Sequence, residues 1–432
     1  MSKILFLFFI LLTNCSLNKN SKFWSETKNI KNENVLNYEE IFPIEETLKK
    51  EFNSNLELQF KSKLSNSTSS NNYLNNDSRL NFDGDLKKSS RFKFSKIKNF
   101  GKYEPELSFF EKDVIFFDNK GSILKFDEKS KMIWKKNYYS KSEKKLKPIL
   151  QLANNDKYLI IADSIAKYYM INIRTGDLIW SKRNLAPFNS QIKIYEDKFF
   201  IIDFSNTLRC FSLKNGNELW NVKTENSLIR SQKKLSMVIV NGKIYFNNSV
   251  GDISAVDIEK EELLWQLPTQ GNLIYESAFS LQTSDIVSDG ESLFFSNNKN
   301  QLFSIDISTG SFNWENKINS NLRSSLINNY LISISIEGYL IITEKKSGNI
   351  LRVTDVFQNF KVKNRSKIKP VGFIVGVNNI YLSTSNGRIL IIEIASGKTI
   401  STKKVDNEKV SKPFIQNKNL FLIKNNAIIK LN

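Results

Sequence analysis

The sequence contains no histidine, and this absence limits the chemistry that the chain can perform. Among 432 residues, a count of zero removes the commonest general base, the commonest metal ligand and every Ser-His or Cys-His nucleophile pair. The 44 Asp and Glu residues are scattered along the chain, and no pair stands apart as a general acid and base. We therefore expect no catalytic residue, no metal ligand and no bound cofactor.

The two cysteines, Cys15 and Cys210, stand in different settings. Cys210 lies in the strand-like stretch Leu208–Phe211, where we expect it to be a small buried apolar residue. Cys15 follows an apolar stretch, Ile4 to Leu12, that is too short to span a bilayer as a permanent helix. A short apolar stretch after a basic residue is typical of a secretory signal peptide. We expect no disulfide between the two cysteines.

Residues 12–15, Leu-Thr-Asn-Cys, resemble the end of a bacterial lipoprotein signal, which has Leu three residues before the Cys. Asn14 stands where that signal prefers Gly, Ala or Ser. The resemblance implies a signal peptide over residues 1–14 and acyl chains on Cys15, and several chains together give stable anchoring. Ser16 in place of Asp implies sorting to the periplasmic face of the outer membrane. The alternative is an ordinary secretory signal with an incidental cysteine.

The net charge of +19 has two interpretations. A basic surface gains affinity for nucleic acid through counterion release. In this chain Lys is interleaved with Asn and Ile throughout, without a compact cluster of Arg and aromatic residues. We favour a diffuse, solvated charge, which also suits an anionic membrane surface, and we expect no nucleic-acid partner.

Residues 15–100 differ in character from the rest of the chain. The stretch 65–72, Ser-Asn-Ser-Thr-Ser-Ser-Asn-Asn, is polar and of low complexity, and cannot bury enough apolar surface to offset its ordering entropy. A short amphipathic helix is predicted over residues 44–60 from apolar residues at four-residue spacing. These are Leu48, Phe52, Leu56 and Phe60. We expect the remainder to be a flexible tether between the lipidated Cys15 and a folded part over residues 101–432.

The folded part carries an internal repeat with a period of about 45 residues. Five tryptophans mark it at spacings of 46, 40, 45 and 49 residues: Trp134, Trp180, Trp220, Trp265 and Trp314. The runs between turn signals are short and rich in β-branched and aromatic residues, which is typical of strands. Four short antiparallel strands in each unit predict a propeller blade.

A polar residue, then Gly four positions on, then Trp four positions further, recurs in these units and predicts a tight turn before the last strand. Glu261 replaces the Gly in one unit, and Arg352 and Ser401 replace the Trp in two others. We expect each Trp to pack between neighbouring sheets, because its ring buries a large area there.

Seven complete units run from about Val114 to Asp406, and two strands follow, at 420–423 and 427–431. A strand from before the first unit, over residues 91–97, is expected to complete another blade by joining both ends of the chain. The predicted fold is therefore all-β, an eight-bladed β-propeller of four-stranded antiparallel blades.

The signature Asp-x-x-x-Gly-x-x-x-Trp, present at residues 306–314, resembles the repeat of pyrroloquinoline-quinone-type (PQQ-like) propellers. That repeat occurs in quinoprotein dehydrogenases and in non-catalytic relatives. With the lipoprotein signal and eight blades, the chain looks most like the BamB family, lipoproteins of the outer-membrane β-barrel assembly machinery. The resemblance implies a non-catalytic periplasmic scaffold that binds the periplasmic domains of a BamA-like, barrel-forming subunit.

The same resemblance points to a binding loop. In the family, the loop after the third-blade Trp carries a Ser-Leu-x-Leu-Arg stretch, and after Trp220 this chain has Ser227-Leu228-Ile229-Arg230, one residue shorter. The predicted partner contacts are Leu228, Ile229 and Arg230, because two apolar anchors beside an Arg have the composition of a hot spot. The alternative is an ordinary connection between blades.

Two other functions stay open. One is a PQQ-dependent quinoprotein oxidoreductase, which would hold its quinone and Ca²⁺ at the propeller centre. Many such enzymes resemble this chain in repeat only, since they carry a vicinal Cys pair over the cofactor that Cys210 alone cannot supply. The other is a propeller that binds peptidoglycan or another envelope anion through its basic surface.

Overall fold

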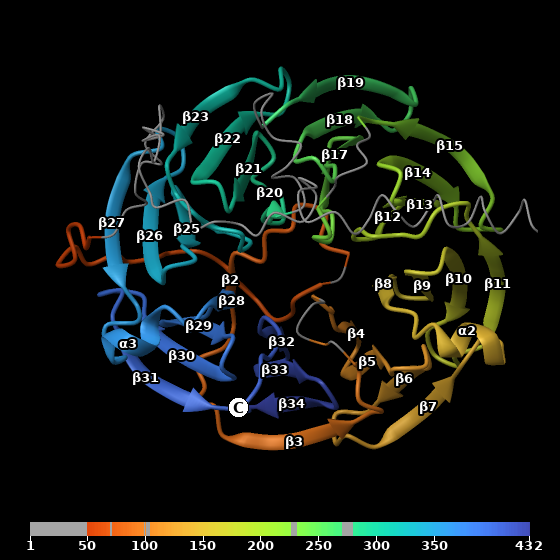
Figure 1. The fold of residues 1–432 in the computed structure, drawn as a ribbon, viewed down its shortest axis with the longest axis horizontal. Coiled ribbons are helices and arrows are strands. Elements are labelled where there is room, and N and C mark those ends of the chain that lie inside the picture. The colour runs from red at the N-terminus through yellow and green to blue at the C-terminus, as the bar shows by residue number, and fades with distance from the viewer. Residues whose placement is uncertain (1–49, 70, 99, 101–103, 226–230, 270–279) are drawn as a thin grey trace, which may run out of the picture. The chain divides into compact units, whose positions relative to one another are not determined.

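The computed structural model describes residues 50–432 apart from residues 70, 99, 101–103, 226–230 and 270–279. The chain divides into two compact units, residues 1–46 and 47–432, and everything described belongs to the second. Its described residues form eight four-stranded antiparallel sheets arranged in a ring (Figure 1). The predicted eight-bladed propeller is confirmed.

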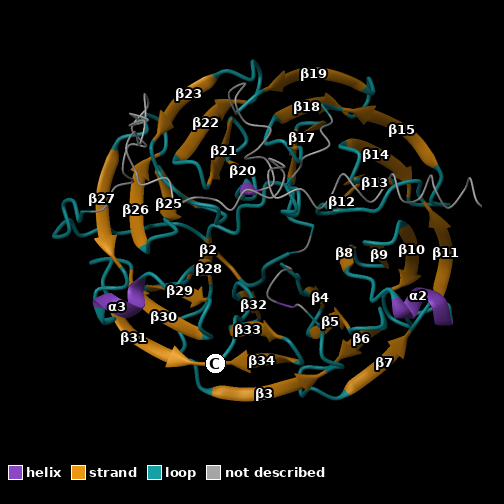
Figure 2. Cartoon of the chain, in the orientation of Figure 1, coloured by secondary structure: helices purple, strands orange, loops and turns teal. Residues whose placement is uncertain are grey.

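In each blade the first strand lies nearest the axis and the fourth lies outermost (Figure 2). The first four blades are β4 (Ser108–Phe110), β5 (Asp113–Phe117), β6 (Ile123–Phe126) and β7 (Met132–Lys136); β8 (Leu150–Asn154), β9 (Tyr158–Asp163), β10 (Lys167–Asn172) and β11 (Leu178–Arg183); β12 (Lys193–Tyr195), β13 (Lys198–Ile202), β14 (Thr207–Ser212) and β15 (Glu218–Lys223); and β16 (Met237–Val240), β17 (Lys243–Asn247), β18 (Ile253–Asp257) and β19 (Glu262–Leu267).

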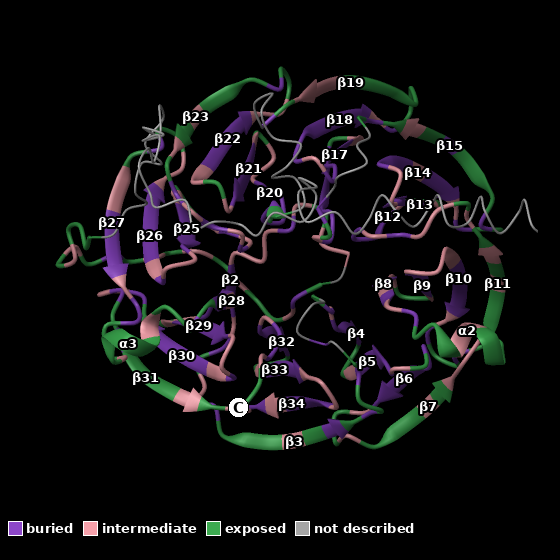
Figure 3. Ribbon diagram, in the orientation of Figure 1, coloured by how far each residue is buried: buried purple, intermediate pink, exposed green. Residues whose placement is uncertain are grey.

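The next three blades follow the same order. They are β20 (Val287–Ser288), β21 (Ser292–Asn297), β22 (Gln301–Asp306) and β23 (Phe312–Asn316); β24 (Ser325–Ile327), β25 (Tyr330–Ile334), β26 (Tyr339–Glu344) and β27 (Ile350–Asp355); and β28 (Pro370–Val375), β29 (Asn379–Thr384), β30 (Arg388–Glu393) and β31 (Thr399–Lys404). Inner strands are buried because sheets cover both of their faces, whereas the outermost strands are largely exposed (Figure 3).

The eighth blade joins segments from both ends of the sequence. Its three inner strands are β32 (Phe414–Gln416), β33 (Asn419–Lys424) and β34 (Ala427–Leu431), and its outermost strand is β3 (Lys88–Lys93). β3 pairs antiparallel with β34, with Arg91 opposite Ile429. The expected closing strand is therefore confirmed, although it begins at Lys88 and ends at Lys93. β32 was missed, because three residues after a proline are too few to show alternation.

Each of the five repeat tryptophans packs between two neighbouring blades, as predicted. Trp265 of β19 donates its ring N–H to the carbonyl oxygen of Ile307 in the next blade, at 3.2 Å. Gly310 in that turn has a φ of +72°, and a Cβ there would lie 2.6 Å from the Trp265 ring. The glycine therefore supplies both a left-handed turn and a flat seat for the indole.

The two departures from the repeat have different consequences. Arg352 takes the place of a Trp, and its buried guanidinium donates to the carbonyl oxygens of Ile394, Ala395 and Leu56. Glu261 takes the place of a Gly and keeps a left-handed φ of +63°. The buried ring N–H of Trp220, the Trp of the preceding unit, has no hydrogen-bond partner among the described residues.

Residues 50–98 differ from the expected helix and flexible tether. No helix forms over 50–60; Phe52 instead pairs with Val353 of β27, and Leu58 is buried against the sixth and seventh blades. The extended chain gains backbone hydrogen bonds from exposed sheet edges that a helix could not make. Further on, β1 (Leu64–Ser65) and β2 (Arg79–Leu80) form a short parallel pair.

Because the strands of each blade alternate in direction, the propeller has two different faces. The open face carries the connections from the fourth strand of one blade to the first strand of the next. These span residues 94–107, 137–149, 184–192, 224–236, 268–286, 317–324, 356–369 and 405–413, and include helices α2 (Lys141–Lys145) and α3 (Val362–Arg365). The closed face carries the turns between first and second strands and between third and fourth strands.

Candidate functional site

A segment of the chain itself, residues 66–84, enters the ring from the closed face and reaches the ends of the open-face connections at Asn75 and Asp77. This segment passes the inner strands in the order in which they lie around the ring. The carbonyl oxygens of Tyr73 and Leu74 accept from the N–H groups of Ile239 and Ser288, at 2.9 and 3.0 Å. The Asn76 side chain accepts from the N–H of Leu326, at 3.2 Å. Hydrogen bonds to otherwise unpaired backbone groups of the inner strands order the polar part of this segment, and buried Leu80 and Phe82 add apolar contacts at its end.

Asn75 lies at the centre of this segment and is only 3% exposed. Its side-chain N–H₂ lies within 3.2 Å of four acceptors at the starts of the third, fourth and fifth blades. These are Gln191 Oε1, Ser236 Oγ, Met237 O and Ile286 O. An amide can reach three blades at once only near the propeller axis. The polar segment just after the low-complexity stretch therefore contributes a buried anchor, which its composition alone did not predict.

Lys193 of β12 holds the other side of the Asn75 amide. Its ammonium donates to Asn75 Oδ1 at 2.6 Å and to the carbonyl oxygen of Asn72. Burial lowers the pKa of Lys193 to about 7, and the nearby carboxylate of Glu106 opposes that shift only in part.

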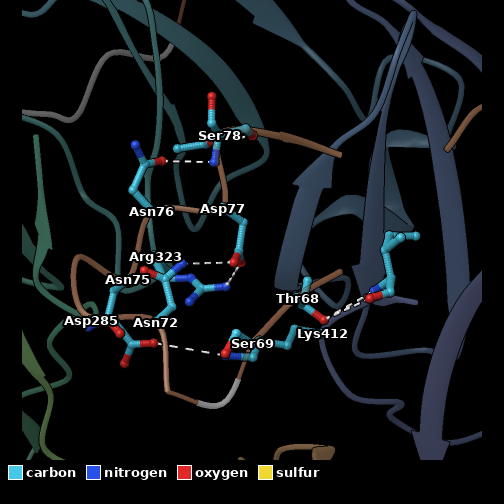
Figure 4. Close-up of polar contacts among 12 residues, drawn as sticks. Thr68, Ser69, Asn72, Asn75, Asn76, Asp77, Ser78, Asp285, Arg323 and Lys412 are labelled. Carbon is cyan, nitrogen blue, oxygen red and sulfur yellow. Dashed lines mark hydrogen bonds and ion pairs between the residues drawn. The ribbon is translucent and has the colours of Figure 1, made fainter. Parts of the chain in front are cut away.

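A network of buried ion pairs lies along the axis. Glu106 accepts from Lys412 at 2.6 Å and lies 3.3 Å from Lys234. Although burial raises the pKa of Glu106, these two lysines hold it well below its usual value. Arg323 pairs with Asp77 of the closed-face segment at 2.6 Å (Figure 4). The network ties the first, fourth, sixth and eighth blades to the segment. Its residues come from distant connections, so no local motif signalled them.

On the open face, two hollows flank the axis. One of about 560 Å³ is lined by three lysines, Lys233, Lys369 and Lys409, with Glu104 and an apolar floor. The second, of about 490 Å³, is lined chiefly by polar side chains and by Phe188. Glu104 and Lys233 form an ion pair and line both hollows. The open face therefore offers concave polar surface that the described residues leave open.

The predicted partner contacts, Leu228, Ile229 and Arg230, lie outside the described residues, and so does Cys15. The connection that contains the first three joins β15 to β16 and belongs to the open face. Its described end is tied to the next connection, because Ser231 Oγ donates to the carbonyl oxygen of Leu281 at 2.6 Å. Cys210 is a buried free thiol, as predicted, and burial raises its pKa to about 12.

Comparison with known proteins agrees with this architecture. A family model described as outer membrane protein assembly factor BamB matches residues 119–354, which is more than half of the chain. The chain belongs to the BamB family. Outer membrane protein assembly factor BamB of Moranella endobia is 22% identical over 255 residues, which cover 57% of this chain and 62% of that protein.

An uncharacterized protein of Rickettsia prowazekii, RP232, is also 22% identical, over 284 residues that cover 62% of this chain and 66% of that protein. The chain thus spans just under two thirds of the length of these relatives. The crystal structure of BamB from Moraxella catarrhalis superposes with a TM-score of 0.64 at 15% identity, covering 80% of this chain and 99% of that one.

Quinoprotein enzymes share the fold. Quinohemoprotein alcohol dehydrogenase from Comamonas testosteroni has a TM-score of 0.60 at 8% identity, covering 83% of this chain and 79% of that one. The axial residues described above do not fit a quinone with Ca²⁺, because Asn75, Lys193 and Arg323 occupy the axis and bond to the chain itself. Within the described ranges, no group of three or more acidic or Cys side chains is placed to hold a metal ion.

The part of the chain that the structure describes has no helix with the length and apolar character needed to cross a membrane.

Proposed function

We propose that this protein is a non-catalytic scaffold of the outer-membrane β-barrel assembly machinery, anchored through Cys15 at the periplasmic face of the outer membrane. Its partner is the barrel-forming subunit, bound through that subunit's periplasmic domains. The observation that carries the proposal is the BamB family match over residues 119–354, and an axis filled by the chain's own polar side chains supports a binding role over a catalytic one.

The partner site that we propose is the open-face connection between β15 and β16, with Leu228, Ile229 and Arg230 as contacts. The residues that directly follow the loop in sequence support this choice, because Ser231, Gln232 and Lys233 line the larger hollow of the open face. The closed face is a poorer candidate, since residues 66–84 already satisfy the inner strand ends there.

Mild detergent extraction of membranes, followed by affinity purification of this chain, tests the proposal. We expect an outer-membrane barrel protein to co-purify. The double variant Leu228→Ala with Arg230→Ala should lose most of that partner, whereas Leu178→Ala with Lys214→Ala, which also removes one Leu and one positive charge but elsewhere, should retain it. Absence of any barrel protein contradicts the scaffold function, and unchanged recovery with the loop variant contradicts the site alone.

The competing functions have their own readouts. Alcohol or sugar oxidation by the purified chain after incubation with quinone and Ca²⁺ would establish an enzyme in place of a scaffold. Salt-sensitive retention on purified peptidoglycan, without a barrel protein, would favour an envelope-binding propeller.

A further inference from the structure

Basic residues are distributed unevenly over the two faces of the propeller. The described closed-face turns hold eleven basic and eleven acidic residues; these turns are 111–112, 127–131, 155–157, 173–177, 196–197, 213–217, 241–242, 258–261, 289–291, 307–311, 328–329, 345–349, 376–378, 394–398 and 417–418. Four consecutive open-face connections, 356–369, 405–413, 94–107 and 137–149, hold thirteen basic and five acidic residues among those described. Among the loops that were counted, the excess positive charge therefore lies in these four open-face connections.

Among the open-face connections, the excess lies on one side. The other four open-face connections, which include the proposed partner loop, hold four basic and two acidic described residues. The charged side is centred on the eighth blade, and β15 and β16, which the proposed partner loop joins, belong to the third and fourth blades across the ring (Figure 1). The two regions can therefore be engaged at the same time.

Two short arms carry most of this charge. The α2 arm, residues 140–147, and the α3 arm, residues 361–369, are separated by the seventh, eighth and first blades. Their eight lysines form no ion pair with any described carboxylate: Lys141, Lys144, Lys145, Lys147, Lys361, Lys363, Lys367 and Lys369. By contrast, several closed-face basic groups are paired, as Arg174 is with Glu111 at 2.9 Å.

Each arm also presents an apolar side chain to solvent. Leu146 is 65% exposed beside the α2 lysines, and Val362 is 81% exposed beside the α3 lysines. An apolar side chain surrounded by unpaired lysines is the pattern of peripheral attachment to anionic lipid: the lysines meet headgroups and the apolar group enters the interface.

We propose that the α2 and α3 arms form a lipid-docking edge that lies on an anionic membrane surface. A membrane is favoured over an acidic protein, because two equivalent arms with three blades between them fit an extended, laterally uniform surface. This contact goes beyond the scaffold function. It also gives the propeller a defined tilt, with the eighth blade toward the lipid and the partner loop away from it.

Vesicle flotation of the full chain with Cys15→Ser, which removes acylation, tests the proposal. We expect binding to vesicles of phosphatidylglycerol and phosphatidylcholine that weakens with salt, and much weaker binding to phosphatidylcholine alone. Replacing Lys141, Lys145, Lys363 and Lys367 by Gln should weaken binding to the anionic vesicles at least about tenfold. Replacing the closed-face lysines Lys129, Lys131, Lys214 and Lys398 by Gln, for the same change in net charge, should weaken it less than about threefold.

A second measurement reports the orientation directly, whatever the N-terminal residues contribute. A polarity-sensitive fluorophore is attached at Leu146→Cys or Val362→Cys in a chain with both native cysteines replaced by Ser. Its emission should shift to the blue on anionic vesicles, and a fluorophore at Leu178→Cys on the outer wall should not respond.

Equal loss of binding in both Lys→Gln sets, or no fluorophore shift at either arm, overturns the lipid-docking edge. If the arm variants bind vesicles normally but lose an acidic protein from a detergent extract, the arms bind a protein and the proposal is again wrong. Neither result affects the scaffold function, which is tested by recovery of the barrel protein in detergent.

Discussion

The closed and open faces of this propeller differ in how far the chain's own residues pair with the exposed groups around the axis. Both faces expose the ends of inner strands around an axis that the eight blades leave between them. On the closed face, residues 66–84 satisfy those strand ends, and Asn75 anchors the segment with its buried amide. On the open face, the connections leave hollows, exposed apolar side chains and unpaired lysines. Where the chain's own residues pair with the polar groups of a face, that face stabilises the fold. Where polar and apolar groups are left exposed, the face remains available for binding.

The largest expected effect comes from removing the closed-face anchor. Asn75→Gly suits the φ of +53° at that position, yet it leaves buried acceptors such as the carbonyl oxygens of Met237 and Ile286 without their donor. We expect a loss of about 3 kcal/mol in the free energy of unfolding, measured by urea denaturation. The exposed open-face change Asn407→Ala should stay within about 0.5 kcal/mol of the parent. Similar losses in the two variants would remove the contrast between the faces.

The next effect is a pH dependence that arises from Lys193. Its pKa is about 7 in the folded chain and has its ordinary, higher value in the unfolded chain. Between these values the unfolded chain holds a proton that the folded chain has lost, so stability rises with pH. This contribution should reach about 2 kcal/mol between pH 7 and pH 9. Urea midpoints of the parent and of Lys193→Met at both pH values measure it, and an equal slope in both proteins would contradict it.

A smaller effect separates two tryptophans that pack beside closed-face turns. The Trp314 ring N–H donates to the carbonyl oxygen of Lys345 at 2.9 Å, whereas that of Trp220 has no described partner. Trp→Phe removes the N–H in both cases. We expect Trp314→Phe to cost about 1 kcal/mol more unfolding free energy than Trp220→Phe. Equal losses of unfolding free energy in the two variants would mean that ring packing alone stabilises these side chains.

The smallest effect is expected on the open face. Leu185 is 97% exposed and Leu146 is 65% exposed, so neither contributes much buried area to the fold. Leu185→Ser and Leu146→Ser should each change the melting temperature by no more than a degree or two, equivalent to less than about 0.5 kcal/mol. A loss of several degrees would show that this face is packed and not free to bind.

The propeller was predictable because its signal is repeated. A turn that needs a polar residue and a glycine, followed by a Trp, appears in unit after unit. A wrongly assigned strand in one unit therefore does not change the predicted fold. Even the closing strand could be placed, since a ring of four-stranded blades lacked one strand. The degenerate units were harder to interpret. Arg352 did not signal that a guanidinium would replace an indole, because its acceptors lie 42 and more residues away in sequence.

The axial network and the fate of residues 50–98 were not predictable in the same way. Ser and Asn at positions 65–72 have the composition of a disordered tether, and in isolation they lack the apolar area to order themselves. Inside the ring they meet inner strand ends that need partners, and their amide and hydroxyl groups supply them. The four-residue spacing from Leu48 to Phe60 likewise indicated a helix. Instead, the edge strand β27 offers Phe52 backbone hydrogen bonds in an extended form, and the turn between β30 and β31 accepts a hydrogen bond from the N–H of Leu58.

The sequence by itself determined the repeat, the number of blades, the burial of Cys210 and the absence of histidine chemistry, because each follows from local patterns or composition. Only the tertiary structure decided which face is closed, which charges are paired and where the unpaired lysines gather. Those properties depend on residues from separate blades meeting at the axis or along one rim. The closure of the ring sets that meeting, and no single stretch of the chain encodes it.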